Sequence, residues 1–200
     1  MSAQPLPSVA RHWPLGTGAT HESGGLRFED FSARTRFGCK GPESEAWLSR
    51  CGYKVPAQPN YAEVDGRGIL VARLGLSEFL IEAVDGGAEE VAARAADLLL
   101  NEPPAGVYPV ARQDTAIGVT GAALNTLLRQ ICSVDFASLL EHAVSAAGPV
   151  VLTSMIGVGV VAWPRRSADG ASLTLWLDPS FADYFCTTLV KVATPWSAAS

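Results

Sequence analysis

The most distinctive polar cluster in the sequence is Arg112-Gln113-Asp114, at the start of a segment with strand character. A carboxylate accepts two N–H donors at once, so Asp114 is suited to hold the amino-pyrimidine edge of a pterin. An ion pair between Arg112 and Asp114 at a strand end, within the chain or across a subunit contact, explains the same residues. Both interpretations stay open, and these two residues are the cofactor-binding candidates that the sequence offers.

The other arrangements that carry chemistry are missing from the sequence. It contains no Gly-x-Gly-x-x-Gly after a strand, no Gly-x-x-x-x-Gly-Lys-Ser/Thr and no Gly-x-Ser-x-Gly. Gly157-Val158-Gly159 lies inside a strand pattern, where glycines indicate a bend rather than a phosphate loop. His142 follows Asp135 by seven residues, but no nucleophile accompanies them. We therefore expect no catalytic residue and no active site in this chain.

The cysteines and histidines do not predict a metal site either. The cysteines are widely spaced, no two form a Cys-x-x-Cys pair, and each stands in an apolar pattern, so we expect reduced core residues. The histidines stand far apart and lack a second ligand nearby. The residues concerned are Cys39, Cys51, Cys132 and Cys186, with His12, His21 and His142.

Composition restricts the partners and the location. Of the 200 residues, 48% are hydrophobic and 18% charged, and the formal net charge is -5, without a basic run that could follow a phosphate backbone. Nucleic acid is therefore an unsuitable ligand, while the low charge indicates a surface partly covered by a partner. The apolar stretch Val150–Trp163 is interrupted and too short for a membrane span. No secretory signal is present, so we expect a cytoplasmic protein that binds no membrane.

Residues 1–34 form a leader rich in proline and glycine, which we expect to be extended. In a complex such a leader wraps a neighbouring subunit, and its large side chains Trp13, Phe28 and Phe31 are then the interface anchors. A simple frayed terminus explains the same composition. The tail at 194–200 is predicted to be loose.

The intervening segment, 35–193, is organised as two similar halves. The patterns predict a strand at 35–40, a helix to residue 51, two strands within 68–82 and a helix at 88–101. A strand segment at 107–120, a helix at 122–132, a short helix to His142, a hairpin of 150–164 with 172–177 and a helix at 178–192 follow. Phe37-Gly-Cys-Lys-Gly and Ile117-Gly-Val-Thr-Gly align, each before a helix. This order predicts an α+β domain of two pseudo-repeated ferredoxin-like units sharing one core.

Five phrases are spread over roughly residues 35–192. They are Phe37-Gly-Cys-Lys-Gly-Pro, Ala72-Arg-Leu-Gly-Leu-Ser-Glu-Phe-Leu-Ile-Glu, Ile131-Cys-Ser-Val-Asp-Phe, Leu152-Thr-Ser-Met-Ile-Gly-Val and Asp178-Pro-Ser-Phe-Ala-Asp-Tyr-Phe. Together they resemble a known family, the gamma subunit of heterotetrameric sarcosine oxidase and related complexes that oxidise N-methyl amino acids. That family is similar to the folate-binding region of the glycine-cleavage T-protein.

The resemblance implies a non-catalytic structural subunit of an oxidoreductase complex. It implies alpha, beta and delta subunits as partners, a T-protein-like folate-binding fold, and oxidative demethylation of a secondary N-methyl amine such as sarcosine by the complex. FAD, FMN, NAD, tetrahydrofolate and zinc then belong to the partner subunits and none to this chain. The alternative is a stand-alone folate-dependent one-carbon transferase or folate-binding protein. Against it, the chain is a domain too short and carries no Lys-Gly-Cys-Tyr-x-Gly-Gln run.

Overall fold

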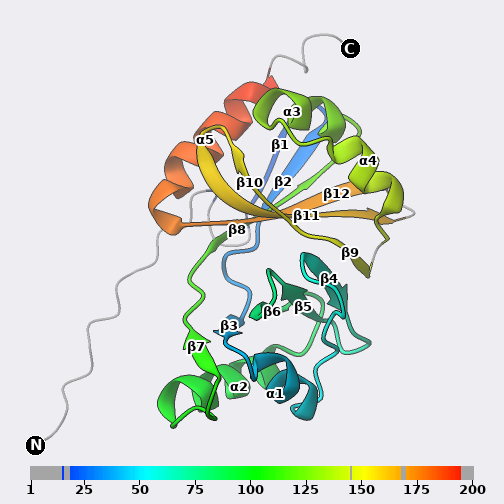
Figure 1. Cartoon of the computed structure of the whole chain (residues 1–200). Coiled ribbons are helices and arrows are strands. Elements are labelled where there is room, and N and C mark those ends of the chain that lie inside the picture. Colours follow the sequence, from blue (N-terminus) through cyan, green and yellow to red (C-terminus); the bar gives the residue numbers. More distant parts are fainter. Residues whose placement is uncertain (1–14, 16–18, 145, 168–169, 195–200) are drawn as a thin grey trace, which may run out of the picture.

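One antiparallel sheet, built mainly from residues 36–110, carries two helices on its outer face. In the computed structural model, which describes residues 15, 19–144, 146–167 and 170–194, this lower sheet of Figure 1 has the strand order β7-β3-β6-β5-β4-β9. Its strands are β3 (Arg36–Lys40), β4 (Tyr61–Val64), β5 (Ile69–Arg73), β6 (Glu78–Ala83), β7 (Tyr108–Val110) and β9 (Ala147–Pro149). Helices α1 (Ser44–Arg50) and α2 (Ala88–Leu100) cover it from below.

A second antiparallel sheet, the upper sheet, combines the hairpin at residues 20–30 with strands from the C-terminal half, in the order β1-β2-β8-β12-β11-β10. Its strands are β1 (Thr20–Ser23), β2 (Leu26–Asp30), β8 (Thr115–Thr120), β10 (Val151–Met155), β11 (Val158–Ser167) and β12 (Gly170–Leu177). Its outer face carries α3 (Leu124–Ile131), α4 (Phe136–His142), the 3-10 turn η1 (Pro179–Phe181) and α5 (Ala182–Ala193). The fold is therefore a four-layer α+β arrangement, with helices outside and two sheets face to face (Figure 1).

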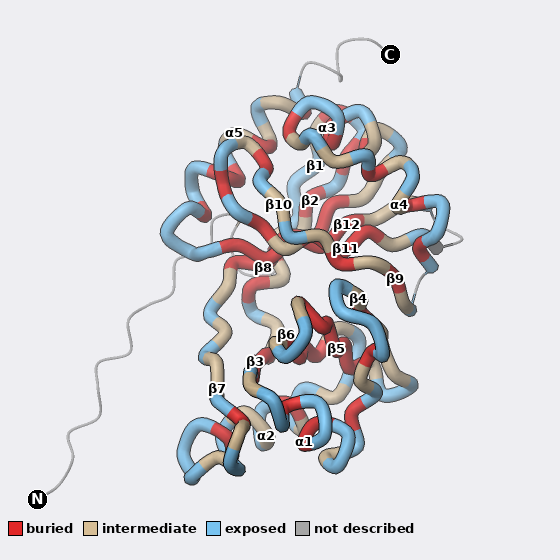
Figure 2. Tube along the Cα trace, in the orientation of Figure 1, coloured by how far each residue is buried: buried red, intermediate tan, exposed pale blue. Residues whose placement is uncertain are grey.

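Three apolar clusters fill the spaces between the layers. Because side chains alternate across a strand, strands β5, β6, β8, β11 and β12 each contribute both to an outer cluster under helices and to the space between the sheets. The upper outer cluster includes Phe28, Val119 and Phe185, and the lower one includes Phe37 and Leu48. The cluster between the sheets is built around Leu70, Leu80, Trp163 and Trp176. Burial is accordingly concentrated along the strands (Figure 2).

Equivalent glycines end the first strand of each half. Gly41 after β3 and Gly121 after β8 have φ of 123° and 130°, a region that favours glycine. A Cβ at Gly41 would overlap the carbonyl of Gly106, and one at Gly121 would overlap the carbonyl of Gly25. In the lower sheet, β7 follows Gly106 and pairs with β3. In the upper sheet, β2 follows Gly25 and pairs with β8.

The leader and the segment 107–120 differ from the sequence-based expectation. Residues 20–30 form the β1–β2 hairpin, which completes the upper sheet, so the folded part begins before the expected boundary at residue 34. The segment 107–120 is two strands in different sheets rather than one, because the chain crosses between the sheets at residues 111–114. Strands β4 and β9 are short and polar or glycine-rich, and their residues carried no strand signal.

The remaining expectations concern the hairpin, the tail and the membrane. The hairpin expected around the turn at residues 165–171 is formed by β11 and β12, and β10 pairs with β11 as a third strand. Thr194 caps the end of α5, and the rest of the tail lies outside the described residues. Within the described part of the chain, none of the helices combines the length and apolar character that a bilayer crossing requires.

Candidate functional site

Arg112 and Asp114 lie on the crossover that joins the two sheets. This segment, residues 111–114, leaves β7 of the lower sheet and enters β8 of the upper sheet. The position explains their strand-end pattern in the sequence. It also places them beside the space between the sheets, where side chains from both halves meet.

The Arg112 guanidinium is held by the lower sheet. Its Nη2 donates to Glu78 Oε1 at 2.7 Å, and its Nη1 lies 3.7 Å from Asp114 Oδ1. The side chain also rests on Gly38, where a Cβ would come within 2.9 Å of the Arg112 Nε. Arg112 is thus part of an internal ion-pair network that includes Asp114, which is one of the two interpretations left open by the sequence.

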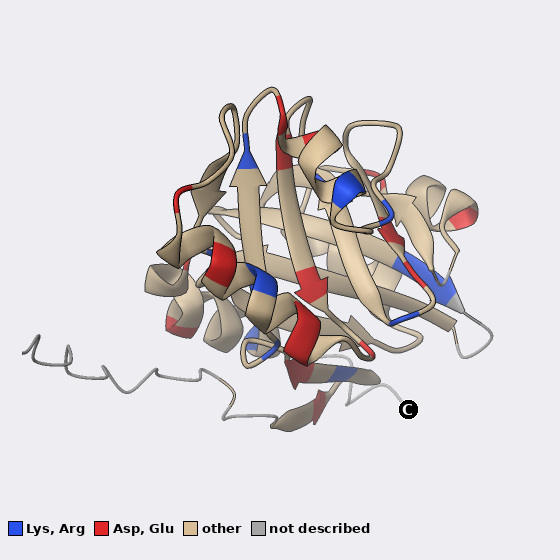
Figure 3. Ribbon diagram, turned by 90° about the horizontal axis from the view of Figure 1, so that it is seen from below, with Lys and Arg blue, Asp and Glu red and all other residues tan. Residues whose placement is uncertain are grey.

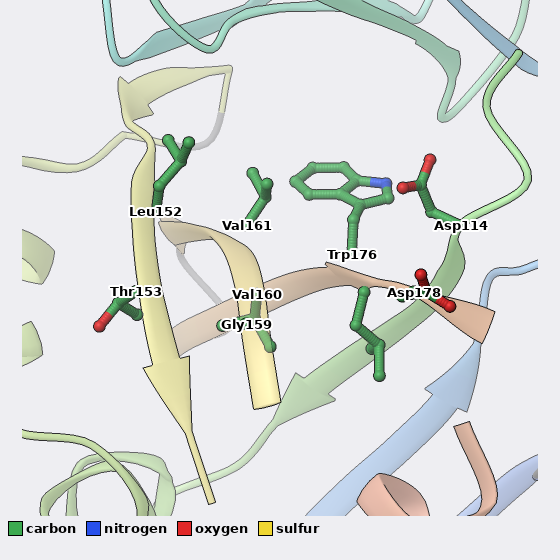
Figure 4. Close-up of a pocket in the computed structure, with 9 residues that line it drawn as sticks. Asp114, Leu152, Thr153, Gly159, Val160, Val161, Trp176 and Asp178 are labelled. Atoms are coloured by element: carbon green, nitrogen blue, oxygen red, sulfur yellow. The ribbon is translucent and has the colours of Figure 1, made fainter. Parts of the chain in front are cut away.

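Asp114 also borders a hollow of about 500 Å³ beside the upper sheet. In Figure 4, Asp114, Trp176, Val161 and Leu152 project to the same side of the sheet, toward the lower half of the molecule. The full lining is Asp114, Leu152, Thr153, Gly159, Val160, Val161, Trp176, Leu177 and Asp178. The hollow is therefore wide and largely apolar, with the carboxylates of Asp114 and Asp178 in its lining.

The second carboxylate, Asp178, is fixed by the start of η1. Its Oδ1 accepts a hydrogen bond from the Ser180 backbone N–H at 2.8 Å. The hydrogen bonds from Ser180 hold the pKa of Asp178 below its usual value, so it is ionised at neutral pH. Because Asp114 is paired with Arg112, Asp178 is the carboxylate that the hollow offers to a ligand, and it suits a donor-rich or cationic group rather than a phosphate.

A buried ion cluster ties the two sheets together next to this hollow. Glu82 of β6 is fully buried, and its Oε2 lies 2.8 Å from Arg36 Nε and accepts a hydrogen bond from Trp176 Nε1 at 2.7 Å. Arg34 approaches its other oxygen at 3.5 Å. Arg36 in turn donates to the backbone oxygens of Phe31 and Asp114. The indole N–H is thus used within the protein, and the crossover is anchored to the cluster.

The residues that sequence analysis considered as a base and its orienting acid have structural contacts. Asp135 accepts hydrogen bonds from the backbone N–H groups of Ala137 and Ser138 and caps α4. Nδ1 of His142 lies 2.9 Å from the Ser138 carbonyl oxygen. Among the described residues, no group of three or more His, Cys, Asp and Glu side chains is placed to hold a metal ion.

The cysteines divide into two buried and two partly buried residues. Cys39 and Cys186 are buried, Cys51 and Cys132 are partly exposed, and all four are free thiols. Burial raises the pKa of Cys39 and that of Cys186 to about 12. Such thiols stay protonated at neutral pH, and the thiol is the unreactive form.

The three expected interface anchors have different positions. Trp13 lies outside the described residues. Phe28 is fully buried in the core under the upper helices, so its assignment as an interface anchor is wrong, because strand β2 turns the ring inward. Phe31 is half-buried between the sheets, with the Arg34 guanidinium 3.6 Å from its ring centroid.

The exposed apolar residues that sequence analysis missed lie on η1, α5 and the edge strand β10 of the upper half, and on the β5–β6 turn and α2 of the lower half. Leu152, Phe181 and Tyr184 are about half exposed. Leu76 and Leu100 are about four-fifths exposed, at the β5–β6 turn and the end of α2. The alternation of residues along a strand does not indicate which face a second sheet covers. The sequence therefore does not predict that Leu152 is exposed.

Comparisons with known proteins give structural similarity without sequence similarity. No family model matches the chain, and no curated protein matches it. Its structure is similar to a chain of heterotetrameric sarcosine oxidase from Corynebacterium sp. U-96, solved in complex with pyrrole 2-carboxylate. The TM-score is 0.71 with 21% identity, over 95% of this chain and 98% of that one.

A second similar structure is the glycine cleavage system aminomethyltransferase T from Bartonella henselae. The TM-score is 0.53 with 14% identity, over 86% of this chain, which spans about half (53%) of the transferase. The fold thus belongs to the class of α+β proteins with two facing antiparallel sheets. More particularly, it is the fold of that sarcosine oxidase chain and of part of aminomethyltransferase T, as the resemblance in the sequence predicts.

Proposed function

We propose that this chain is the non-catalytic, structural gamma subunit of a heterotetrameric flavoenzyme that oxidatively demethylates a secondary N-methyl amine such as sarcosine. The observation that carries the proposal is the end-to-end match to a chain of heterotetrameric sarcosine oxidase, which covers 98% of that chain. Similarity of this extent concerns a whole polypeptide and not a shared substructure. The phrases in residues 35–192 support the same assignment independently.

The contacts of the polar residues support a structural role. Arg112, Asp135 and His142 each bond to neighbouring parts of the chain. The buried charges of Glu82 and Arg36 are directed at each other and at backbone oxygens rather than at the hollow. Charged positions are sparse along the strands (Figure 3), and large apolar side chains such as Leu100 and Leu152 face solvent. Surfaces of this kind are typical of proteins with a permanent partner.

The partners in this proposal are the alpha, beta and delta subunits of the complex. FAD, FMN, NAD, tetrahydrofolate and zinc are bound by those subunits, and the complex acts in the cytoplasm. The proposed role of this chain is to bury apolar surface against the larger subunits, in a contact typically above ~2,000 Å².

We also propose that the two halves are pseudo-repeated ferredoxin-like units. In the lower sheet the order β7-β3-β6-β5 and in the upper sheet the order β2-β8-β12-β11 place equivalent strands in equivalent positions. The equivalent glycines Gly41 and Gly121 support this arrangement. The upper unit differs in one respect, because its outer strand β2 comes from the N-terminal side of the chain.

Isolation of the native complex tests the function. The full-length chain, tagged and expressed in its source cells, is expected to copurify with flavin-containing polypeptides that show flavin absorbance near 450 nm. The purified complex is expected to oxidise sarcosine or a related N-methyl amine and to release the methyl group as a one-carbon unit. Recovery of the tagged chain as a monomer without flavin would refute the proposal.

The second candidate, a folate-binding protein or one-carbon transferase, is favoured by one observation. Asp114 lines the apolar hollow beside Trp176, and the chain matches part of aminomethyltransferase T. Titration of the isolated chain with tetrahydrofolate separates the two candidates. Saturable binding that is weakened by Asp114→Asn, with unchanged thermal stability, favours folate binding by this chain; absence of binding favours the structural role.

A further inference from the structure

The four edge strands of the two sheets are not equally protected. Edge strands expose unpaired backbone groups, and proteins usually block them with charges, prolines or shortness. Strand β1 carries the exposed Glu22, whereas β7 and β9 are three residues long and contain Pro109 and Pro149. Strand β10, Val-Leu-Thr-Ser-Met, is five residues long and has neither a charge nor a proline.

The hairpin geometry determines which groups of β10 face outward. Ile156 and Gly157 form a two-residue turn with φ of 45° and 79°, which makes Met155 and Val158 a hydrogen-bonded pair. Bonded and non-bonded pairs alternate, so the N–H and C=O groups of Leu152 and Ser154 point away from β11. Among the described residues, no backbone hydrogen bond joins Leu152 or Ser154 to a segment other than β11.

The turn that ends β10 is held in place by contacts with the helices of the upper half. The N–H of Ile156 donates to the Ile131 carbonyl oxygen at 3.0 Å, and the Tyr184 hydroxyl donates to the Ile156 carbonyl oxygen at 3.1 Å. On the opposite side Leu152 is 54% exposed, and Ser154 is exposed as well. The edge is therefore both preorganised and accessible, which lowers the entropic cost of pairing with another strand.

The acidic hollow opens directly beside this edge. Leu152 forms its rim, and Gly159, where an added Cβ would meet no atom within 4 Å, leaves space behind the rim. Asp114 and Asp178 lie on its far side (Figure 4). Neighbouring strands are about 4.8 Å apart, so Asp178 on the β12 end is roughly 10 Å from β10. A side chain on an added strand would not reach it, but the polypeptide that continues from that strand would.

We propose that β10 is a docking edge for an extended segment of the partner polypeptide, which pairs with Leu152 and Ser154 and then crosses Leu152 to place a basic side chain beside the exposed carboxylate of Asp178. This inference rests on the proposed function and specifies where the larger subunit binds. Strand addition supplies affinity through backbone hydrogen bonds, while the hollow and its carboxylates supply specificity. A second copy of this chain fits less well, because its own β10, Val-Leu-Thr-Ser-Met, has no basic side chain to place in the hollow.

A matched pair of proline variants tests the docking edge in the copurified complex. Ser154→Pro removes an outward N–H from β10. Glu22→Pro removes an outward N–H from β1 at the opposite edge of the same sheet, since Ser23 and Leu26 flank the Gly24-Gly25 turn. We expect Ser154→Pro to lower recovery of the flavin-containing polypeptide about tenfold, and Glu22→Pro to leave recovery unchanged. Asp178→Asn, which retains the cap, should weaken the complex and reduce its salt dependence.

Hydrogen–deuterium exchange on the wild-type complex gives a readout that does not depend on folding of a variant. We expect slower exchange over residues 151–159 in the complex than in the free chain, with residues 20–26 unchanged. Equal recovery of the two proline variants, with unchanged exchange over 151–159, overturns the docking edge but leaves the subunit role standing. Failure of the wild-type chain to recover any flavin polypeptide overturns both. Concentration-dependent protection of 151–159 without a partner instead identifies a second copy as the occupant.

Discussion

At the scale of single residues, the buried carboxylate of Glu82 depends on partners from both sheets. It is fully buried, 2.8 Å from Arg36 Nε and hydrogen-bonded by Trp176 from the other sheet. Removing one partner of a buried pair leaves the other charge uncompensated, which costs more than the pair itself contributes.

Glu82→Gln is therefore expected to lower the free energy of unfolding by about 3 to 5 kcal/mol, measured by urea denaturation. Glu90→Gln is the matched control, since Glu90 pairs with Arg67 at 2.8 Å but both side chains are 40% exposed. The control should cost less than about 1 kcal/mol. Comparable effects for the two variants would show that the buried cluster does not anchor the sheets.

The buried thiols predict a loss of stability in alkali. Burial raises the pKa of Cys39 and Cys186 from 9.0 to about 12. The folded state therefore retains protons that the unfolded state releases, so this stability is complete below pH 9 and is lost as the pH rises from about 9 to about 12.

Between pH 8 and pH 10 the two thiols together should account for a loss of about 2 to 3 kcal/mol. Urea denaturation at each pH measures this loss. In the Cys39→Ala/Cys186→Ala variant the pH dependence over this interval should be shallower, and in either single variant the reduction should be about half as large. An unchanged slope in the double variant would exclude the thiols as its source.

At the scale of elements, strand β2 shows why the leader belongs to the folded unit. It pairs with β8 along four residues and buries Leu26 and Phe28 under the upper helices. Its counterpart in the lower sheet is β7, which follows the second helix of that half in the usual way. In the upper half the equivalent strand is β2, which comes before β8 in the sequence instead of after the second helix.

Phe28→Ala is accordingly expected to destabilise the isolated chain by about 3 to 5 kcal/mol, because it leaves a cavity in a closed core. Thermal or urea unfolding of the isolated chain measures this. Tyr184→Ala, at an aromatic side chain that is 55% exposed, is the control and should have a much smaller effect. If Phe28→Ala left stability intact and weakened only the complex, the original interface assignment would be restored.

The elements that could be predicted from the sequence are those with strong local periodicity. Helix α2, with Val91 and Leu98 on its inner face, and strands β5 and β6 were identified to within a residue or two. The β1–β2 hairpin was missed because glycine and proline around it mask a four-residue alternation. The split of 107–120 into β7 and β8 depends on the second sheet, and no local pattern reports which sheet a strand joins.

The candidate site was predictable only as a pair of residues. Arg112 and Asp114 were recognised from their charge, and the structure places them on the crossover. Their partner Glu78, the hollow and the exposed face of β10 are determined by contacts between distant residues, such as Glu78 and Arg112, which are 34 positions apart. Contacts between such distant residues produce no local pattern in the sequence, so they cannot be predicted without the fold.

At the scale of the whole molecule, the two sheets depend on each other. The cluster between them buries Leu70 and Leu80 from one sheet against Trp163 and Trp176 from the other. Glu82 receives its indole donor from across the same space. In addition, β2 of the N-terminal half completes the upper sheet, so neither half of the sequence contains a complete unit.

This interdependence predicts the behaviour of a chain divided at the crossover. The fragments 1–110 and 111–200, expressed separately, should each lack a cooperative thermal transition. Fragment 1–110 exposes the inner face of its sheet and an unpaired β2, and fragment 111–200 lacks β2, one of the two strands that pair with β8. Expressed together, they should copurify and unfold in a single transition, since the contacts between them are those of a protein core. Calorimetry and copurification through a tag on one fragment measure both outcomes. A cooperative transition in 1–110 alone would mean that the lower sheet folds independently and that the layers are two domains in contact.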